Sequence, residues 1–223
     1  MNDMGWAAVN RADGADRRSN PRGRRLSDIL APLTVVADIG CRKASGALSE
    51  MTGTPIMAKA VQVRRLPLGA VPELVGGAET VVTATYLRIG GQIRGHMLLM
   101  LPLEDGCSLA SMLLGERVEP APELPAMACS ALGEIGNITA SFFLAALGDS
   151  TGLEVTPSPP AIAVDMSAAV LDTVLADLAR DSNEALVIDT VFTSGESEQR
   201  VNAFFLVMPR QQDFELIMDR LPH

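Results

Sequence analysis

The sequence predicts an α+β fold: a pseudo-twofold domain of two helix–strand–strand–strand repeats, with an antiparallel sheet covered by two long helices. A long helical pattern opens each half of the chain, and segments of alternating or continuous apolar residues follow it. Glycine-containing turns, rather than helical crossovers, join the neighbouring strand segments, which favours antiparallel pairing. With 223 residues and 48% hydrophobic content, the chain can bury a substantial core.

The elements are expected in the same order in both halves. In the first half a helix is expected at 26–53, strands at 56–66, 80–89 and 92–101 with a turn at Gly90 and Gly91, and a closing helix at 107–115. In the second half a helix is expected at 123–148, a strand at 152–158, an extra helix at 167–180, strands at 184–194 and 199–208 around a turn at Gly195 and Glu196, and a closing helix at 213–221. The predicted domain therefore spans 27–223, with halves at about 27–116 and 121–223.

Composition excludes several classes of function. A net charge of −9 argues against nucleic acid or an anionic membrane as the main partner. Six arginines lie within the first 25 residues, in a polar segment typical of a disordered basic tail, at 1–26. Three cysteines are expected to be reduced thiols, which indicates a cytoplasmic protein. Only two histidines are present, so a histidine-rich metal site is excluded, and His96 is expected to be an ordinary strand residue.

The helix predicted at 123–148 carries an apolar and a polar stripe. Residues 127, 131, 135, 138, 142 and 145 recur at helical spacing and are expected to face the core. Ser130, Glu134 and Asn137 lie at i, i+4 and i+7 and share another face. Such polar residues also occur on any solvated helix face. Gly133 and Gly136 each cost a helix about 0.5–1 kcal/mol relative to alanine. They are expected on the outward side of the polar face, where they would let a partner protein approach closely.

A longer pattern decides between these interpretations. Ser130-x3-Glu134-x2-Asn137-x22-Pro160 resembles the signature of the CheC/CheX/FliY family of chemotaxis phosphatases, and the similarity extends from about residue 27 to the end. The resemblance implies two long helices on an antiparallel sheet. It also implies hydrolysis of the aspartyl phosphate of a phosphorylated CheY-type response regulator, which brings its own Mg²⁺. The protein itself would need no cofactor and no metal.

The resemblance also assigns roles to residues. Asn137 would hold a water molecule in line with the phosphorus, and Glu134 would pair with a lysine of the partner. Ser130 and Pro160 would support them, with Pro160 making the connection near the site rigid. The first half departs from the pattern, because Ala31, Val35, Asp38 and Val61 stand at the matching positions. The first half is therefore interpreted as a degenerate copy and the second as the active one.

Two other functions stay open. The chain could be a non-catalytic adaptor that binds a receiver domain or a CheD-type receptor deamidase, with Asp165 and the helix that follows it as the candidate surface. It could also be a structural component of the flagellar switch. In FliY that role belongs to an additional C-terminal domain, and none is read in this sequence. The intact Glu134 and Asn137 favour catalysis over a pure adaptor.

Overall fold

The computed structural model describes residues 26–121, 123–178, 184–194 and 197–222. The helices are α2 (Leu26–Thr52), α3 (Leu103–Leu114), α4 (Ala126–Thr151), α5 (Ser167–Leu178) and α6 (Gln211–Arg220), with the short 3-10 helices η2 (Leu68–Ala70) and η3 (Pro72–Val75). The strands are β1 (Ile56–Pro67), β2 (Val81–Gly91), β3 (Gly95–Pro102), β4 (Val155–Pro157), β5 (Ala161–Met166), β6 (Glu184–Ser194) and β7 (Ser197–Pro209). All strand pairs are antiparallel.

The order of the strands in the sheet shows the pseudo-twofold symmetry between the two halves. The sheet runs β1-β6-β7-β3-β2-β4, with β5 also pairing with β2. The first strand of each half pairs with the second strand of the other half, and the two third strands meet at the centre. The sheet is therefore one continuous layer built equally by both halves. This confirms the predicted fold class.

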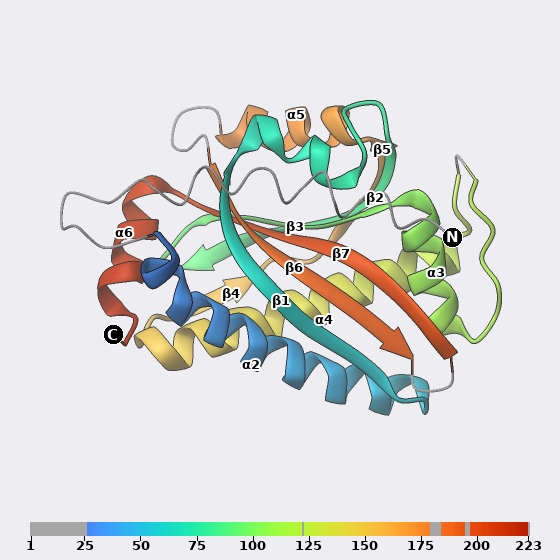
Figure 1. Ribbon diagram of the computed structural model, residues 1–223, viewed down its shortest axis with the longest axis horizontal. Helices are drawn as coiled ribbons and strands as arrows, with labels where there is room; N and C mark the ends of the chain where they lie inside the picture. Colours follow the sequence, from blue (N-terminus) through green and yellow to red (C-terminus); the bar gives the residue numbers. More distant parts are fainter. Residues whose placement is uncertain (1–25, 122, 179–183, 195–196, 223) are drawn as a thin grey trace.

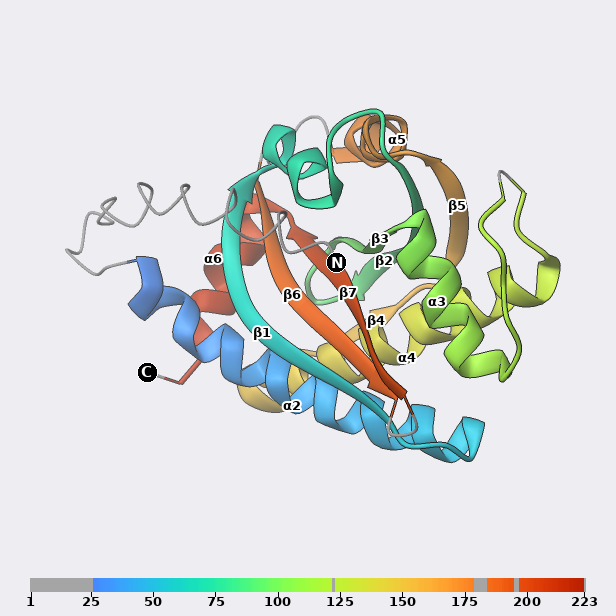
Figure 2. The ribbon, with the colours of Figure 1, turned by 45° about the vertical axis from the view of Figure 1, so that its right-hand side comes forward.

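The sheet has a different cover on each face. The long helices α2 and α4 run side by side on one face, while α5, η2 and η3 lie on the other (Figures 1 and 2). The larger apolar core lies under α2 and α4, and a second core lies under α5 and the 3-10 helices. α4 is long and apolar enough to cross a membrane, but 61% of its most apolar window is buried in the described fold. α4 is therefore packed as a core helix.

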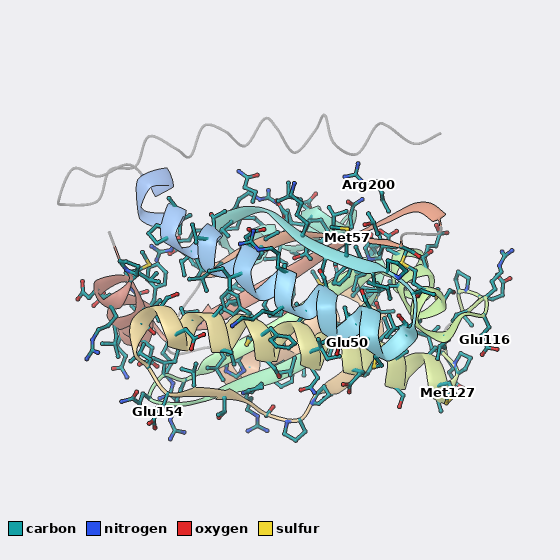
Figure 3. All side chains as sticks on the ribbon, turned by 90° about the horizontal axis from the view of Figure 1, so that it is seen from below. Glu50, Met57, Glu116, Met127, Glu154 and Arg200 are labelled. Atoms are coloured by element: carbon teal, nitrogen blue, oxygen red, sulfur yellow. The ribbon has the colours of Figure 1, made fainter. Side chains whose placement is uncertain are left out.

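The two long helices touch along their length, as the view in Figure 3 shows. Gly40 of α2 makes this approach possible, since a Cβ at that position would lie only 2.9 Å from the Cα of Phe143 in α4. Lys43 of α2 and Asp149 of α4 form an ion pair at 3.5 Å. The position of α4 is thus fixed by its neighbour helix as well as by the sheet.

Most predicted elements are confirmed, with three differences. Strand β2 continues through Gly91, so the turn to β3 falls at 92–94 and not at Gly90 and Gly91. The strand expected at 152–158 is only three residues long, and β5 after it was not predicted. Residues 1–25 of the basic tail and the turn at Gly195 and Glu196 lie outside the described residues.

The helix predicted as an extra element has a counterpart in the first half. Subtracting 99 from the numbers of β4 and β5 gives the residues of β1, and the same offset places α5 opposite η2 and η3. Val71 and Val75 of the 3-10 segment then match Val170 and Val174 of α5, and all four are buried in the second core. Each half therefore covers the second core with a segment of its own, helical in one half and 3-10 in the other.

Candidate functional site

The burial pattern of α4 decides which of its residues can act. The predicted core stripe is correct at Ala131 and Ile135, which are buried, but the centre of the buried face is displaced by about one residue. Met127 is 65% exposed and Ala145 is exposed, whereas the residue after each member of the predicted stripe is buried. The residues buried in this way are Ala128, Leu132, Gly136, Thr139, Phe143 and Ala146. Because one residue turns a helix by about 100°, the core faces a different side of α4 from the one predicted.

The predicted role of the glycines is wrong for this reason. Gly133 and Gly136 are both buried, and they face the sheet of their own chain. A Cβ at Gly136 would lie 2.4 Å from Cγ2 of Thr85 in β2. A Cβ at Gly133 would lie 3.5 Å from Cδ1 of Ile162 in β5 and 3.9 Å from Cγ of Pro160. The glycines therefore allow close approach between helix and sheet, and they are not open to another protein.

The polar residues do lie on the surface as predicted. Ser130 and Glu134 are exposed and Asn137 is half-buried, within an arc of about 60° on the helix. The side chains of these three residues make no hydrogen bond or ion pair with another described residue. Glu134 and Asp149 are the charged residues of α4, and Asp149 is paired with Lys43. Among the described residues, Glu134 is thus the charge on α4 that has no partner.

Pro160 is brought to the same place. It is exposed, lies between β4 and β5, and packs beside Gly133, the residue before Glu134. Ser158 fixes this connection, because its hydroxyl accepts the N–H of Arg88 at 2.9 Å and its own N–H donates to the Arg88 carbonyl at 2.9 Å. The sequence analysis did not identify Ser158 as a structural residue. The run Ser158-Pro159-Pro160 could have indicated it, since serine and proline are typical of turns.

Asp165 lies apart from this cluster. It is exposed on β5, opposite Val82 of β2, and its carboxylate accepts the N–H of Met166 at 2.7 Å. Four residues of strand separate it from Ala161, or about 13 Å. α5 begins only at Ser167, so Asp165 belongs to the edge strand and not to the helix predicted near it. Asp165 therefore belongs to a different part of the surface from Glu134.

In the first half, the matching positions form no such site. Val35 is 59% exposed and Val61 is 45% exposed where the second half has Glu134 and Pro160. Asp38, at the asparagine position, pairs with Arg42 one turn later at 2.8 Å. Val61 falls at a bulge in β1, whereas the second half has a full break between β4 and β5 at that point. The sheet register thus supports the sequence alignment of the two halves.

The other side chains that could take part in chemistry, the histidine and the cysteines, have structural environments. His96 lies on the sheet face opposite α4, with its Nδ1 2.6 Å from the Tyr86 hydroxyl. Cys41, Cys107 and Cys129 are all free. Burial, and next the Asp38 carboxylate, raise the pKa of the Cys41 thiol to about 11. Within the described ranges, no group of three or more His, Cys, Asp or Glu side chains could hold a metal ion.

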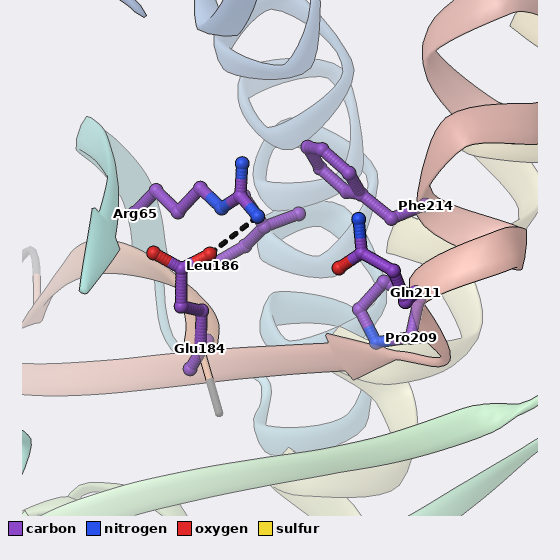
Figure 4. Close-up of a pocket in the computed structure, with 7 residues that line it drawn as sticks. Arg65, Glu184, Leu186, Pro209, Gln211 and Phe214 are labelled. Carbon is purple, nitrogen blue, oxygen red and sulfur yellow. Dashed lines mark ion pairs between the residues drawn. The ribbon is translucent and has the colours of Figure 1, made fainter. Parts of the chain in front are cut away.

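Two hollows in the surface lie away from α4. One is a small gap of about 10 Å³ between β1, β6 and α6, where Arg65 pairs with Glu184 and stacks 4.8 Å from the ring centre of Phe214 (Figure 4). The other is an open groove beside α3, between Thr54 and the loop around Arg117. No residue of α4 lines either hollow. The polar face of α4 is an exposed helix surface, which suits a protein partner better than a small molecule.

Comparison with known proteins finds similarity both to the segment that carries this face and to most of the chain. The model of the CheC-like family matches residues 127–164, the segment that runs from the first turn of α4 through Pro160 to β5. Over 185 residues the chain is 29% identical to the CheY-P phosphatase CheC of Bacillus subtilis (strain 168), covering 82% of this chain and 88% of that protein. The chain is thus similar to proteins of the CheC/CheX/FliY family.

Solved structures with low sequence identity to the chain share its fold. FliY of Thermotoga maritima superimposes with a TM-score of 0.69 at 16% identity, covering 86% of this chain and 97% of that one. The FliM middle domain of H. pylori superimposes with a TM-score of 0.62 at 10% identity, covering 87% of this chain and 98% of that one. The fold is thus common to chains whose sequences differ widely. The segment matched by the CheC-like model, residues 127–164, contains the polar residues of α4 and Pro160.

Proposed function

We propose that this protein hydrolyses the aspartyl phosphate of a phosphorylated CheY-type response regulator in chemotaxis, in the cytoplasm, with Glu134 and Asn137 as catalytic residues. One observation supports this most. Glu134 is an exposed carboxylate without a partner among the described residues, beside Asn137, on a helix whose other charged residue, Asp149, is paired with Lys43. The relative from B. subtilis, which aligns over most of the chain, is a CheY-P phosphatase.

The two side chains have separate tasks in this reaction. Hydrolysis breaks the bond between phosphorus and the aspartate oxygen and forms one to the oxygen of water, releasing inorganic phosphate. Phosphoryl transfer depends mainly on positioning and charge stabilisation. The amide of Asn137 can align the attacking water by hydrogen bonds without changing protonation. The carboxylate of Glu134 can pair with a lysine of the regulator, which orients the two proteins.

The metal in this scheme belongs to the partner. Mg²⁺ bound by the regulator would neutralise charge on the phosphoryl group, and this protein would supply no ligand to it. We therefore expect the purified protein to hold no stoichiometric transition metal in elemental analysis. We expect EDTA to stop hydrolysis, and Mg²⁺ added in excess to restore it. A tightly bound metal in the isolated protein would contradict the proposal.

The test is phosphate release from a panel of phosphorylated receivers of the host. Asn137→Ala should lower the rate by about 10²–10³, because one preorganised contact to the reacting water is lost. Glu134→Ala should weaken both binding and turnover. Asp149→Ala, which removes the other charge of α4, and Asp38→Ala, at the matching first-half position, should leave the rate per folded molecule nearly unchanged. Equal losses in Asp38→Ala and Asn137→Ala would refute a single site.

An adaptor is the second candidate, and a different part of the surface favours it. Val81 is 39% exposed and Met166 is 46% exposed, and they are opposite each other in the β2–β5 register next to Asp165. This small apolar and acidic patch could hold a receiver or a CheD-type deamidase. If wild-type protein binds a receiver in pull-down or calorimetry but accelerates hydrolysis of none, the adaptor function is correct and the phosphatase function is not.

A further inference from the structure

One buried hydroxyl joins the sheet to the turn of α4 that carries the polar residues. Thr85 of β2 is 3% exposed, and its Oγ1 donates a hydrogen bond to the carbonyl oxygen of Leu132 at 3.1 Å. In a helix, that oxygen also accepts the N–H of Gly136. The residues between them, 133–135, include Glu134, and Asn137 follows directly. Thr85 is thus bonded to the backbone turn on which the proposed catalytic residues stand.

The two glycines make this bond possible. Thr85 lies directly beneath Gly136, where any Cβ would come within 2.4 Å of its methyl group. Ile162 stands opposite Thr85 in the β2–β5 register and lies beneath Gly133. We call these four residues the glycine seat: Gly133 and Gly136 of α4 on Thr85 and Ile162 of the sheet. The seat sets both the height of α4 above the sheet and its rotation about its own axis.

The seat also fixes α4 relative to Pro160. Ile162 follows Pro160 by two residues, and both contact the Gly133 position from β5 and its preceding loop. Any movement of the helix on the seat would change the spacing between Glu134 and Pro160.

The equivalent position beneath α2, the helix that lacks the polar residues, also lacks the seat. The residues at the matching helix positions are Thr34 and Ala37 instead of the two glycines. The matching cross-strand pair is Val63 and Ile188, which are paired in the β1–β6 register and carry no hydroxyl group. The glycines, the threonine and the polar face are thus found together at α4 and not at α2, although Thr85 itself belongs to the first half of the chain. A seat needed only for folding would be expected beneath both long helices, since both pack on the same sheet.

We infer that Thr85 is a positioning residue for hydrolysis: through Leu132 it holds Glu134 and Asn137 in the geometry that the reaction needs. This inference rests on the proposed function. Thr85 touches no substrate and acts only through the backbone of α4. Its loss should lower kcat and leave KM nearly unchanged, because the helix still presents both side chains to the partner. A displacement of about 1 Å in a catalytic group can reduce the rate by up to about 10².

The chain offers a matched control on the same strand. Thr83 is 2% exposed and lies beneath Gly106 of α3, where a Cβ would be 2.2 Å from its hydroxyl. The Thr83 hydroxyl has no hydrogen-bond partner among the described residues. Thr83→Val and Thr85→Val therefore make the same chemical change at equally buried sites beneath a glycine. They differ in that only Thr85 is bonded to α4.

The experiment compares Thr85→Val, Thr85→Ser and Thr83→Val in steady-state hydrolysis and in amide hydrogen exchange. Thr85→Val should lower kcat about tenfold with KM within twofold, and should speed exchange at residues 133–137. Thr85→Ser keeps the hydroxyl and should recover most of kcat. Thr83→Val should match wild type in kcat and in exchange of α4.

Three results would overturn the inference: a folded Thr85→Val that keeps wild-type kcat, equal loss in the serine and valine variants, or equal loss in Thr83→Val. Failure of the proposed function is seen separately, as a wild-type protein that hydrolyses no receiver phosphate. In that case the exchange measurement still decides whether Thr85 holds the turn. Unchanged exchange at residues 133–137 in Thr85→Val would refute the inference by itself.

Discussion

Replacing each α4 glycine by alanine should change stability in opposite directions. Alanine gains about 1 kcal/mol over glycine in a helix interior. At Gly133 the new Cβ would lie 3.5 Å from Ile162, an ordinary van der Waals distance. Gly133→Ala should therefore keep the gain of about 1 kcal/mol, which raises Tm by about 2–4 °C in a chain of this size.

At Gly136 the gain in helix propensity is smaller than the cost of a steric clash with Thr85. The new Cβ would lie 2.4 Å from Cγ2 and 2.7 Å from Cβ of Thr85, and the latter atom belongs to a buried strand and cannot rotate away. Overpacking of this kind costs about 1–3 kcal/mol. Moving α4 outward to relieve it would weaken the bond from Thr85 to Leu132, at about 1 kcal/mol. We expect Gly136→Ala to be destabilised by about 2 kcal/mol net, a fall in Tm of about 4–8 °C.

The assay is urea and thermal unfolding of both variants beside wild type, followed by far-ultraviolet circular dichroism. A double variant, Gly136→Ala with Thr85→Ser, tests the cause. Serine lacks the methyl group at 2.4 Å, so the double variant should be more stable than the sum of the single changes. If both alanine variants gained stability, α4 would not be seated on Thr85 as described. If both alanine variants lost stability, the expected stabilisation of α4 by alanine at position 133 would be refuted.

Two further outcomes follow from the same structure. Introducing Val35→Glu and Asp38→Asn together into a Glu134→Ala, Asn137→Ala background should restore no phosphate release, because α2 has no glycine seat beneath it and position 61 is not a proline. Recovery of a tenth of wild-type activity would refute this. In native protein at pH 8, Cys41 should not react with a disulfide reagent, because its raised pKa, about 11, and its burial keep it a protonated, covered thiol; in denaturant it should react at the rate of a model thiol.

The sequence predicted the fold because each element carries a strong local pattern. The long helices have helical spacing, the strands alternate, and the repeated order indicates the two halves. β5 was missed because it is a short edge strand that begins directly after Pro159 and Pro160. Prolines argue against assigning a strand to a segment of sequence. Only the pairing with β2 shows that this segment continues the sheet, and such pairing depends on residues far away in the chain.

The site was predicted in part for a similar reason. The pattern of Ser130, Glu134 and Asn137 is local, and these residues are where helical geometry puts them. The side of α4 that meets the sheet is not a local property, because α4 is buried against both the sheet and α2. A helix covered on two sides has apolar residues over a wide arc. The spacing of the apolar residues therefore does not locate the centre of the buried face accurately. The displacement by one residue moved Gly133 and Gly136 from the core to the surface in the prediction.

This distinction bears on how the two halves diverged. Both halves keep what the fold needs, namely a long helix, three strand positions and a cover for the second core. The surroundings of α4 also keep features that do not serve helix stability: Gly133 and Gly136 in mid-helix, a buried threonine of β2 bonded to α4, a carboxylate without a partner among the described residues and a proline at the sheet edge. Asp38 shows the other outcome, since its charge is neutralised by Arg42 at 2.8 Å. A chain that shares the fold is therefore assigned an activity by these few positions and not by its superposition.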